Sequence, residues 1–178
     1  VRERAHLIPE RGRVLCVAEG QGRNAVHLAE LGHDVTAFDQ SIEGVKKARA
    51  LADDRGVSVR FVHADAREFD VGEGCWDAVV SVFAHMPPEI RQDLHRRLVA
   101  GLAPGGVLLL EAYAPAQAER DTGGPPDPAL CMDLDTLRRE LAGLEFEVAH
   151  ALEREVVEGA YHTGMAAVTQ VVARKIPS

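Results

Sequence analysis

The segment VLCVAEGQGRNAVHLAELG, residues 14–32, decides the fold. Its first residues are apolar or small, as in a buried strand, and apolar positions with helical spacing follow Arg23. Between them, Gly20 and Gly22 open a tight turn, because glycine adopts backbone conformations that other residues rarely do. A glycine turn between a buried strand and a helix indicates that a ligand approaches the backbone there.

The rest of the chain continues to alternate strand and helix patterns. We expect strands over residues 13–18, 34–39, 57–65, 75–83 and 106–113, and helices over residues 23–32, 41–56 and 87–106. Such alternation predicts an α/β fold with a doubly wound, mostly parallel sheet covered on both faces. A short helix over 133–143 and an antiparallel hairpin over 144–175, with its turn around 158–164, complete the chain.

Residues 114–132 are rich in proline, glycine and alanine and have no regular period. A loop of this length in a compact domain is often functional, for example as a lid. A surface insertion without function is the alternative.

Composition limits the class of protein. The chain has 178 residues, 46% of them hydrophobic, which suits one domain over residues 1–178. Its net charge of −8 argues against a nucleic-acid partner, and no apolar run approaches the roughly 20 residues of a membrane span. The three cysteines are widely spaced, which favours buried thiols in the cytoplasm over a metal site. We expect a monomer or homodimer.

Two carboxylates follow neighbouring strands of the predicted sheet. Asp39 ends the second strand about 20 residues after the glycine turn, in the place of a ribose-binding acid. Asp65 ends the third strand, so both acids and the turn face one crevice. The crevice suits either a dinucleotide or S-adenosylmethionine. Glu19 lies beside the turn, where it would repel a pyrophosphate and attract a cation, and this favours S-adenosylmethionine.

These segments together resemble class I S-adenosylmethionine-dependent methyltransferases. The match lies in VLCVAEGQGRNAVHLAELGHDVTAFDQS, FVHADA, CWDAVVSVF and LAPGGVLLLEAY, and it extends over nearly the whole chain. GRN after the glycines and the ending YHTG…VVARK are similar to the tellurite-resistance and thiopurine type, which methylates small molecules. The resemblance implies a Rossmann-like methyltransferase fold and S-adenosylmethionine as cofactor. It also implies an N-terminal lid, for which only a short segment precedes the first strand.

The resemblance assigns cofactor contacts by motif position. Gly20 and Gly22 would approach the methionyl part, Asp39 the ribose and Asp65 the adenine. The full set of expected cofactor-binding residues is Glu19, Gly20, Gly22, Asn24, Asp39, Gln40, Ser41, Asp65, Ala66, Ser81 and Phe83. This chain departs from the motif at Cys16, where the family has an acid, and at Ala18, where it has glycine. Glu19 is the candidate for the displaced carboxylate.

The acceptor is expected at the rim of the sheet formed by His85 and Met86, residues 111–113, the segment 114–132 and the turn 158–164. A thiolate needs little more than alignment with the methyl group, whereas oxygen or nitrogen needs a general base. His85 and His162 are the candidate bases. The sequence therefore predicts methyl transfer to a small molecule such as a thiol or a chalcogen oxyanion. An NAD-dependent oxidoreductase and a non-catalytic cofactor-binding protein are the alternatives.

Overall fold

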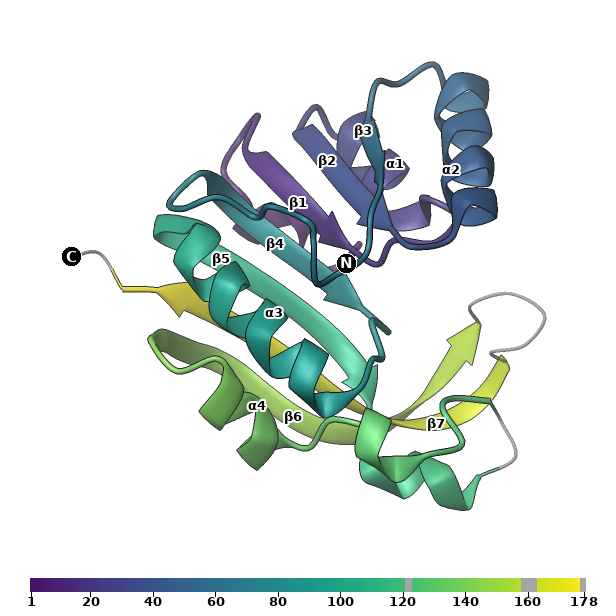
Figure 1. Ribbon diagram of the computed structural model, residues 1–178, viewed down its shortest axis with the longest axis vertical. Coiled ribbons are helices and arrows are strands. Elements are labelled where there is room, and N and C mark those ends of the chain that lie inside the picture. The colour runs from purple at the N-terminus through teal and green to yellow at the C-terminus, as the bar shows by residue number, and fades with distance from the viewer. Residues whose placement is uncertain (121–122, 158–162, 177–178) are drawn as a thin grey trace.

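A seven-stranded sheet forms the centre of the molecule (Figure 1). The computed structural model describes residues 1–120, 123–157 and 163–176. The strand order is β3-β2-β1-β4-β5-β7-β6, and β7 runs opposite to the other six strands. Strand order therefore reverses between β1 and β4, where α/β sheets bind their ligands. The doubly wound fold expected from the sequence is confirmed.

The elements follow the predicted alternation closely. The strands are β1 (Arg13–Val17), β2 (Asp34–Asp39), β3 (Arg60–His63), β4 (Trp76–Val82), β5 (Leu102–Tyr113), β6 (Leu144–Val157) and β7 (Thr163–Lys175). The helices are α1 (Arg23–Glu30), α2 (Ile42–Arg55), α3 (Pro88–Gly101) and α4 (Leu134–Glu140), with 3-10 turns η1 (Ala5–Leu7), η2 (Pro115–Glu119) and η3 (Pro128–Leu130). The strand expected over 57–65 is shorter, and α3 ends earlier than expected because β5 begins at Leu102.

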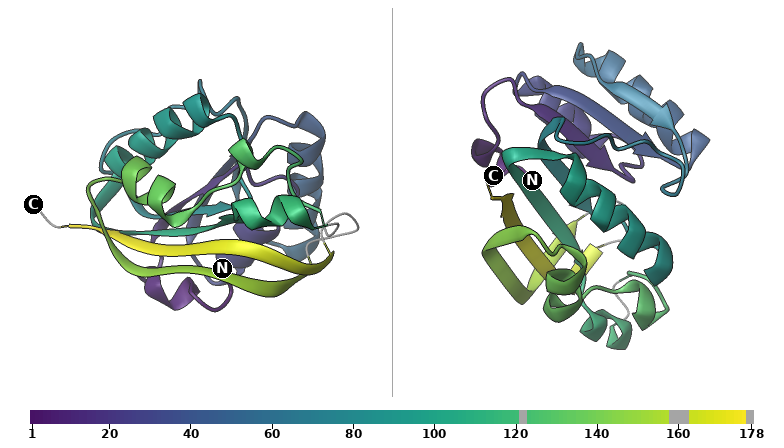
Figure 2. Two further views of the ribbon diagram at one scale, coloured as in Figure 1. Left: turned by 90° about the horizontal axis from the view of Figure 1, so that it is seen from below. Right: turned by 60° about the vertical axis from the view of Figure 1, so that its left-hand side comes forward.

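Helices cover both faces of the sheet, as the two views of Figure 2 show. On one face, α1 and α2 bury Ala25, Leu28 and Ala48 against β1 and β2. On the other, α3 and α4 bury Leu94 and Leu137 against β4, β5 and β7. Strands buried on both faces read as continuous apolar runs, which explains why their pattern was clear in the sequence.

The segment 114–132 is fixed to the body of the protein in its described part. The buried Gln117 accepts a hydrogen bond from Ala167 N at 2.8 Å and donates one to Gly123 O at 2.7 Å. Further on, Thr169 Oγ1 donates to Met132 O at 2.7 Å. Buried polar groups bonded in this way hold a segment in place. The structure therefore describes a packed wall at the end of β5 and along the first half of β7.

Within the described residues, no helix is long and apolar enough to cross a membrane.

Candidate functional site

The glycine turn joins β1 to α1 and contains Gly20 and Gly22. Gly20 and Gly22 have φ angles of +60° and +83°, in the left-handed region that favours glycine. A Cβ at Gly22 would lie 2.7 Å from Ala48 Cβ, so this glycine lets α1 approach α2. At Gly20 a Cβ would meet no atom within 4 Å. The turn is thus open at Gly20, where a ligand can approach the backbone.

Asp39 links the turn to the end of β2. Its Oδ2 accepts a hydrogen bond from Gly20 N at 2.8 Å, and its Oδ1 accepts one from Ser41 N at 2.7 Å. Ser41 in turn caps α2 through Gly44 N at 3.1 Å. A carboxylate has about four acceptor positions. Asp39 is thus rigidly held and still able to accept hydrogen bonds from the two hydroxyl groups of a ribose.

Glu19 closes the first turn of α1. One of its oxygens, Oε1, accepts hydrogen bonds from Asn24 N at 2.7 Å and from Ala25 N at 2.9 Å. Burial raises the pKa of Glu19 to about 7, and the two backbone hydrogen bonds oppose that rise. A carboxyl group here stabilises the positive end of the helix and offers negative charge to a cation beside the turn.

A pocket of about 200 Å³ opens at the carboxyl ends of β1, β2 and β3. We call it the strand-end pocket, and its lining residues are Ala18, Phe38, Asp39, Gln40, Ala64, Asp65, Ala66, Arg67, His85, Met86, Pro87 and Ile90. Acidic and polar groups stand on the β2 and β3 side, and Met86, Pro87 and Ile90 form an apolar wall at the start of α3. Such a pocket suits a flat ring with a polar group beside it, such as the adenine and ribose of an adenosine.

Ala18 gives the pocket an unusual backbone. It follows β1 with a φ of +47°, and Phe83 follows β4 with a φ of +54°. Alanine and phenylalanine rarely adopt this region, and such strain clusters at functional sites. β1 and β4 are neighbours, so both strained residues lie where strand order reverses.

His85 lies at the edge of the strand-end pocket and joins three segments. Its Nδ1 lies 2.9 Å from Leu130 O, to which it donates, and its Nε2 accepts from Tyr113 N at 3.2 Å. Its ring stacks on Tyr113, at 5.3 Å between ring centroids, and Tyr113 stacks on Phe83 at 4.6 Å. Both ring nitrogens have partners, so the geometry favours His85 as an anchor for the rim over His85 as a general base.

The comparisons with known proteins agree with this site. A family described as "Methyltransferase domain" matches residues 14–106, which contain the glycine turn, Asp39 and the whole strand-end pocket. The chain belongs to the class I S-adenosylmethionine-dependent methyltransferases.

Relatives of this chain differ in what they act on. The chain is 29% identical over 117 residues to the 2-heptyl-1-hydroxyquinolin-4(1H)-one methyltransferase of Mycobacteroides abscessus, a match of 64% of this chain and 52% of the relative. It is 33% identical over 114 residues to the tRNA 5-carboxymethoxyuridine methyltransferase of Escherichia coli, a match of 61% of this chain and 43% of the relative. The chain thus spans about half the length of these relatives.

The fold has a counterpart among solved structures. TehB from Haemophilus influenzae superposes with a TM-score of 0.80 at 21% identity, over 98% of this chain and 60% of TehB. At this identity the match shows a shared fold.

The residues of this methyltransferase fit S-adenosylmethionine, the cofactor of the family. Asp39 retains acceptor positions for a diol, the backbone at Gly20 is open, and Glu19 places a carboxyl group where an ammonium or sulfonium group would be favoured. Glu19 and Gly20 belong to the glycine turn and Asp39 is hydrogen-bonded to it, so the three would act on one ligand.

The structure brings most of the predicted cofactor residues together. Asp39, Gln40, Asp65 and Ala66 line the strand-end pocket, and the adjoining turn and first turn of α1 contain Glu19, Gly20, Gly22 and Asn24. Ser41 caps α2 and binds Asp39. Ser81 is 2% exposed at the end of β4, and Phe83 packs with Tyr113. The cofactor contacts of all these residues remain predictions.

The residues expected at the acceptor rim do not line a single pocket in the structure. Met86 lines the strand-end pocket, but Tyr113 is only 1% exposed. Glu111 faces a different cavity, where it pairs with Arg154 and accepts a hydrogen bond from Gln170 at 2.6 Å. His162, the other candidate base, and Tyr161 lie outside the described residues.

Three apolar residues of the pocket were not predicted from the sequence. Phe38, Pro87 and Ile90 belong to strand and helix patterns that also suit a core, so their pattern gave no sign of a binding role. The proline that opens α3 was the available signal, because it places the start of that helix at the end of β4.

Proposed function

We propose that this chain transfers the methyl group of S-adenosylmethionine to a small-molecule acceptor. The single observation that carries the proposal is Asp39, held by Gly20 N and Ser41 N at the edge of the strand-end pocket. A carboxylate fixed between a glycine turn and an apolar pocket suits an adenosine whose ribose faces the turn. The cytoplasmic location expected from the sequence belongs to this proposal.

Bound S-adenosylmethionine would supply a methyl group on a positively charged sulfur. A lone pair of the acceptor would take this methyl group, and S-adenosylhomocysteine would leave. The residues of this chain bind and align the reactants. Asp39 accepts the ribose hydroxyls, Glu19 offers negative charge beside the turn, and Met86 and Ile90 exclude water from one side of the base. Alignment of this kind supplies much of the acceleration when two reactants are held in line.

A small-molecule acceptor is supported by charge and by one relative. The chain carries a net charge of −8, whereas proteins that bind nucleic acids carry a basic surface. The Mycobacteroides relative is named for a heteroaromatic small molecule. Because the Escherichia relative is named for tRNA, bulk tRNA belongs in the acceptor panel as the competing class.

Isothermal titration with S-adenosylmethionine, S-adenosylhomocysteine and NAD tests the cofactor assignment. We expect micromolar binding of the first two and none of NAD. Asp39→Ala should weaken S-adenosylhomocysteine binding at least about tenfold, because a carboxylate hydrogen bond to a ligand contributes about 1.5–3 kcal/mol. Asp54→Ala, whose side chain is 80% exposed on α2, is the matched control. Binding of NAD, or unchanged affinity in Asp39→Ala, contradicts the assignment.

The acceptor is tested by release of S-adenosylhomocysteine with thiols, tellurite, selenite, hydroxyquinolinones and bulk tRNA. Turnover with a small molecule and none with tRNA supports the proposal. Turnover with tRNA alone overturns the acceptor class, and binding without any turnover favours a non-catalytic protein.

A further inference from the structure

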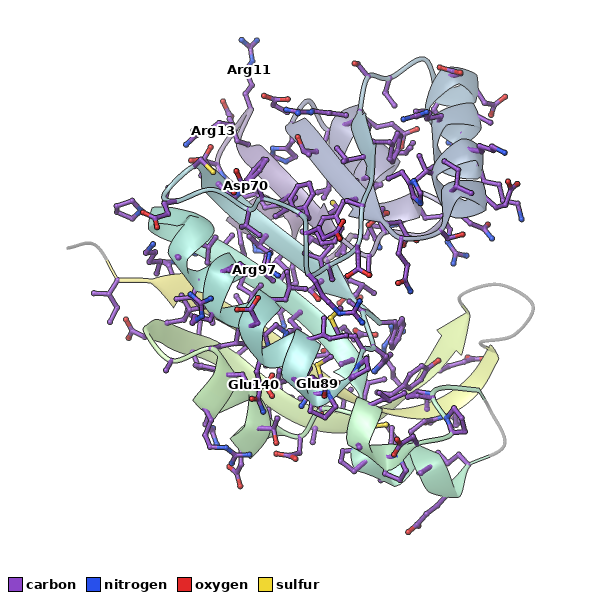
Figure 3. All side chains as sticks on the ribbon, viewed as in Figure 1. Arg11, Arg13, Asp70, Glu89, Arg97 and Glu140 are labelled. Carbon is purple, nitrogen blue, oxygen red and sulfur yellow. The ribbon has the colours of Figure 1, made fainter. Side chains whose placement is uncertain are left out.

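Arg97 reaches from the middle of α3 to the connection between β3 and β4, where Figure 3 labels it. Its Nη1 donates to Phe69 O at 2.9 Å, and its Nη2 donates to Ala66 O. Its Nε donates to Asp93 on the same helix at 2.8 Å. The side chain is 21% exposed, so it spans the gap between helix and connection as a packed tie.

The connection that Arg97 ties down is one wall of the strand-end pocket. It contains Asp65 and Ala66, which both line the pocket, and Phe69, whose ring stacks on Phe38 at 4.2 Å between centroids. The stretch has no strand or helix of its own to satisfy its carbonyl groups. Backbone hydrogen bonds from Glu68 N and Phe69 N to Asp65 O form a turn. Arg97 adds side-chain bonds to two carbonyls of this turn, one inside it at Ala66 and one at its end at Phe69.

We propose that Arg97 is a positioning residue that fixes Asp65 and Ala66 against the adenine base of the cofactor. This inference rests on the proposed function. A planar guanidinium group with several donors holds two carbonyls in one fixed arrangement, which a lysine ammonium group does not do. Arg97 thereby links the recognition of the base to α3, whose first turn supplies the apolar wall on the opposite side of the pocket.

The same helix contains a matched control. Arg96 also donates a hydrogen bond to Asp93, at 2.7 Å, but its side chain is 71% exposed. Arg96→Met and Arg97→Met remove the same charge from adjacent positions. A difference between the two variants therefore reports the tie to the connection, not the loss of a cation.

The test compares two ligands in the full chain. S-inosylhomocysteine lacks the exocyclic amino group of S-adenosylhomocysteine, so it lacks the hydrogen bond that Asp65 would accept from the base. We expect the wild type to prefer the adenosyl ligand by about tenfold. Arg97→Met should weaken binding of the adenosyl ligand about tenfold and change the inosyl ligand by no more than about twofold. Arg96→Met should leave both dissociation constants within about twofold of the wild type.

Arg97→Lys is the second variant, to be used if Arg97→Met does not fold. It retains the charge and the packing of the aliphatic part of the side chain. It should lose most of the preference for adenine. An unchanged ratio of the two dissociation constants in the folded variant overturns the inference, whether both ligands weaken equally or neither weakens. If the wild type binds S-adenosylhomocysteine and the ratio of the two dissociation constants is unchanged in the variant, only the positioning role of Arg97 is rejected. If the wild type does not bind S-adenosylhomocysteine, the proposed function is rejected as well.

Discussion

Glu19 combines a role in folding with its proposed role in cofactor binding. Its carboxyl group caps α1 through Asn24 N and Ala25 N, yet burial raises its pKa to about 7. A folded-state pKa above the ordinary value of about 4.4 means that the folded protein binds the proton more tightly than the unfolded chain. The free protein therefore loses stability as pH rises from about 4.4 through 7, and a bound cation would offset that loss.

Glu19→Gln should remove this pH dependence. At pH 8, without cofactor, we expect the variant to be about 1–2 kcal/mol more stable than the wild type. This is less than the ~3 kcal/mol of a fully buried group, because Glu19 keeps some exposure. The difference should vanish near pH 4.5. Urea unfolding across this range measures it, with Glu43→Gln as the exposed control. A variant that is less stable at pH 8 would show that the carboxylate cap outweighs burial.

Ala18 carries strain that glycine would remove. Its φ of +47° costs an L-residue roughly 1 kcal/mol. Ala18→Gly should therefore raise the free energy of unfolding by about 0.5–1 kcal/mol, the relief of strain exceeding the added entropy of the unfolded chain. Ala29→Gly, inside α1, should lower it by about 1 kcal/mol. Urea unfolding of the pair gives the sign, and equal losses would exclude strain at Ala18.

At the scale of elements, two glycines two residues apart have separable roles. Gly22 lies where a Cβ would press on Ala48 of α2, so Gly22→Ala should cost about 2–4 kcal/mol through overpacking and backbone strain. Gly20 has open space, so Gly20→Ala should cost about 1 kcal/mol of strain and should mainly weaken S-adenosylhomocysteine binding. Urea unfolding and titration on both variants separate the effects. Equal effects of the two substitutions on stability and binding would contradict this division.

The elements that could be predicted from the sequence are those with local patterns. β1, α1, β2 and α2 have strong periodicity, with Ser41 and Gly56 at the ends of α2 as cap signals. The structure of segment 114–132 could not be predicted in this way. Its conformation depends on hydrogen bonds between residues far apart in sequence, from Ala167 N to Gln117 and from Thr169 to Met132 O. Likewise, the glycine turn and its acids could be predicted from motif spacing, whereas the tie from Arg97 to Ala66 could not.

At the scale of the whole molecule, a buried network joins the cofactor half of the chain to the C-terminal half. Arg91 of α3 binds Glu140 of α4 with two hydrogen bonds of 2.9 Å, and its Nη1 donates to Ala129 O at 3.3 Å. His95 Nδ1 lies 2.8 Å from Glu140 Oε2. Together with the bond from His85 to Leu130 O, these contacts fix the wall at the end of β5 to the helix that opens beside the strand-end pocket.

Glu140 should dominate the acid limit of stability. Burial disfavours its charge, but the neighbouring His95 and Arg91 outweigh burial and lower its pKa to about 2. A depressed pKa contributes stability above the ordinary value of about 4.4, and that contribution is lost as pH falls toward 2. Glu140→Gln should therefore cost about 3–5 kcal/mol at pH 7, since it leaves Arg91 buried without its charge partner. The cost should shrink as pH falls below about 4.4. Urea unfolding from pH 3 to pH 7 tests this, with Glu147→Gln, from the exposed pair with Arg174, expected to cost no more than about 1 kcal/mol. A cost that does not change with pH would mean that Glu140 acts through packing, and that the network does not set the acid limit.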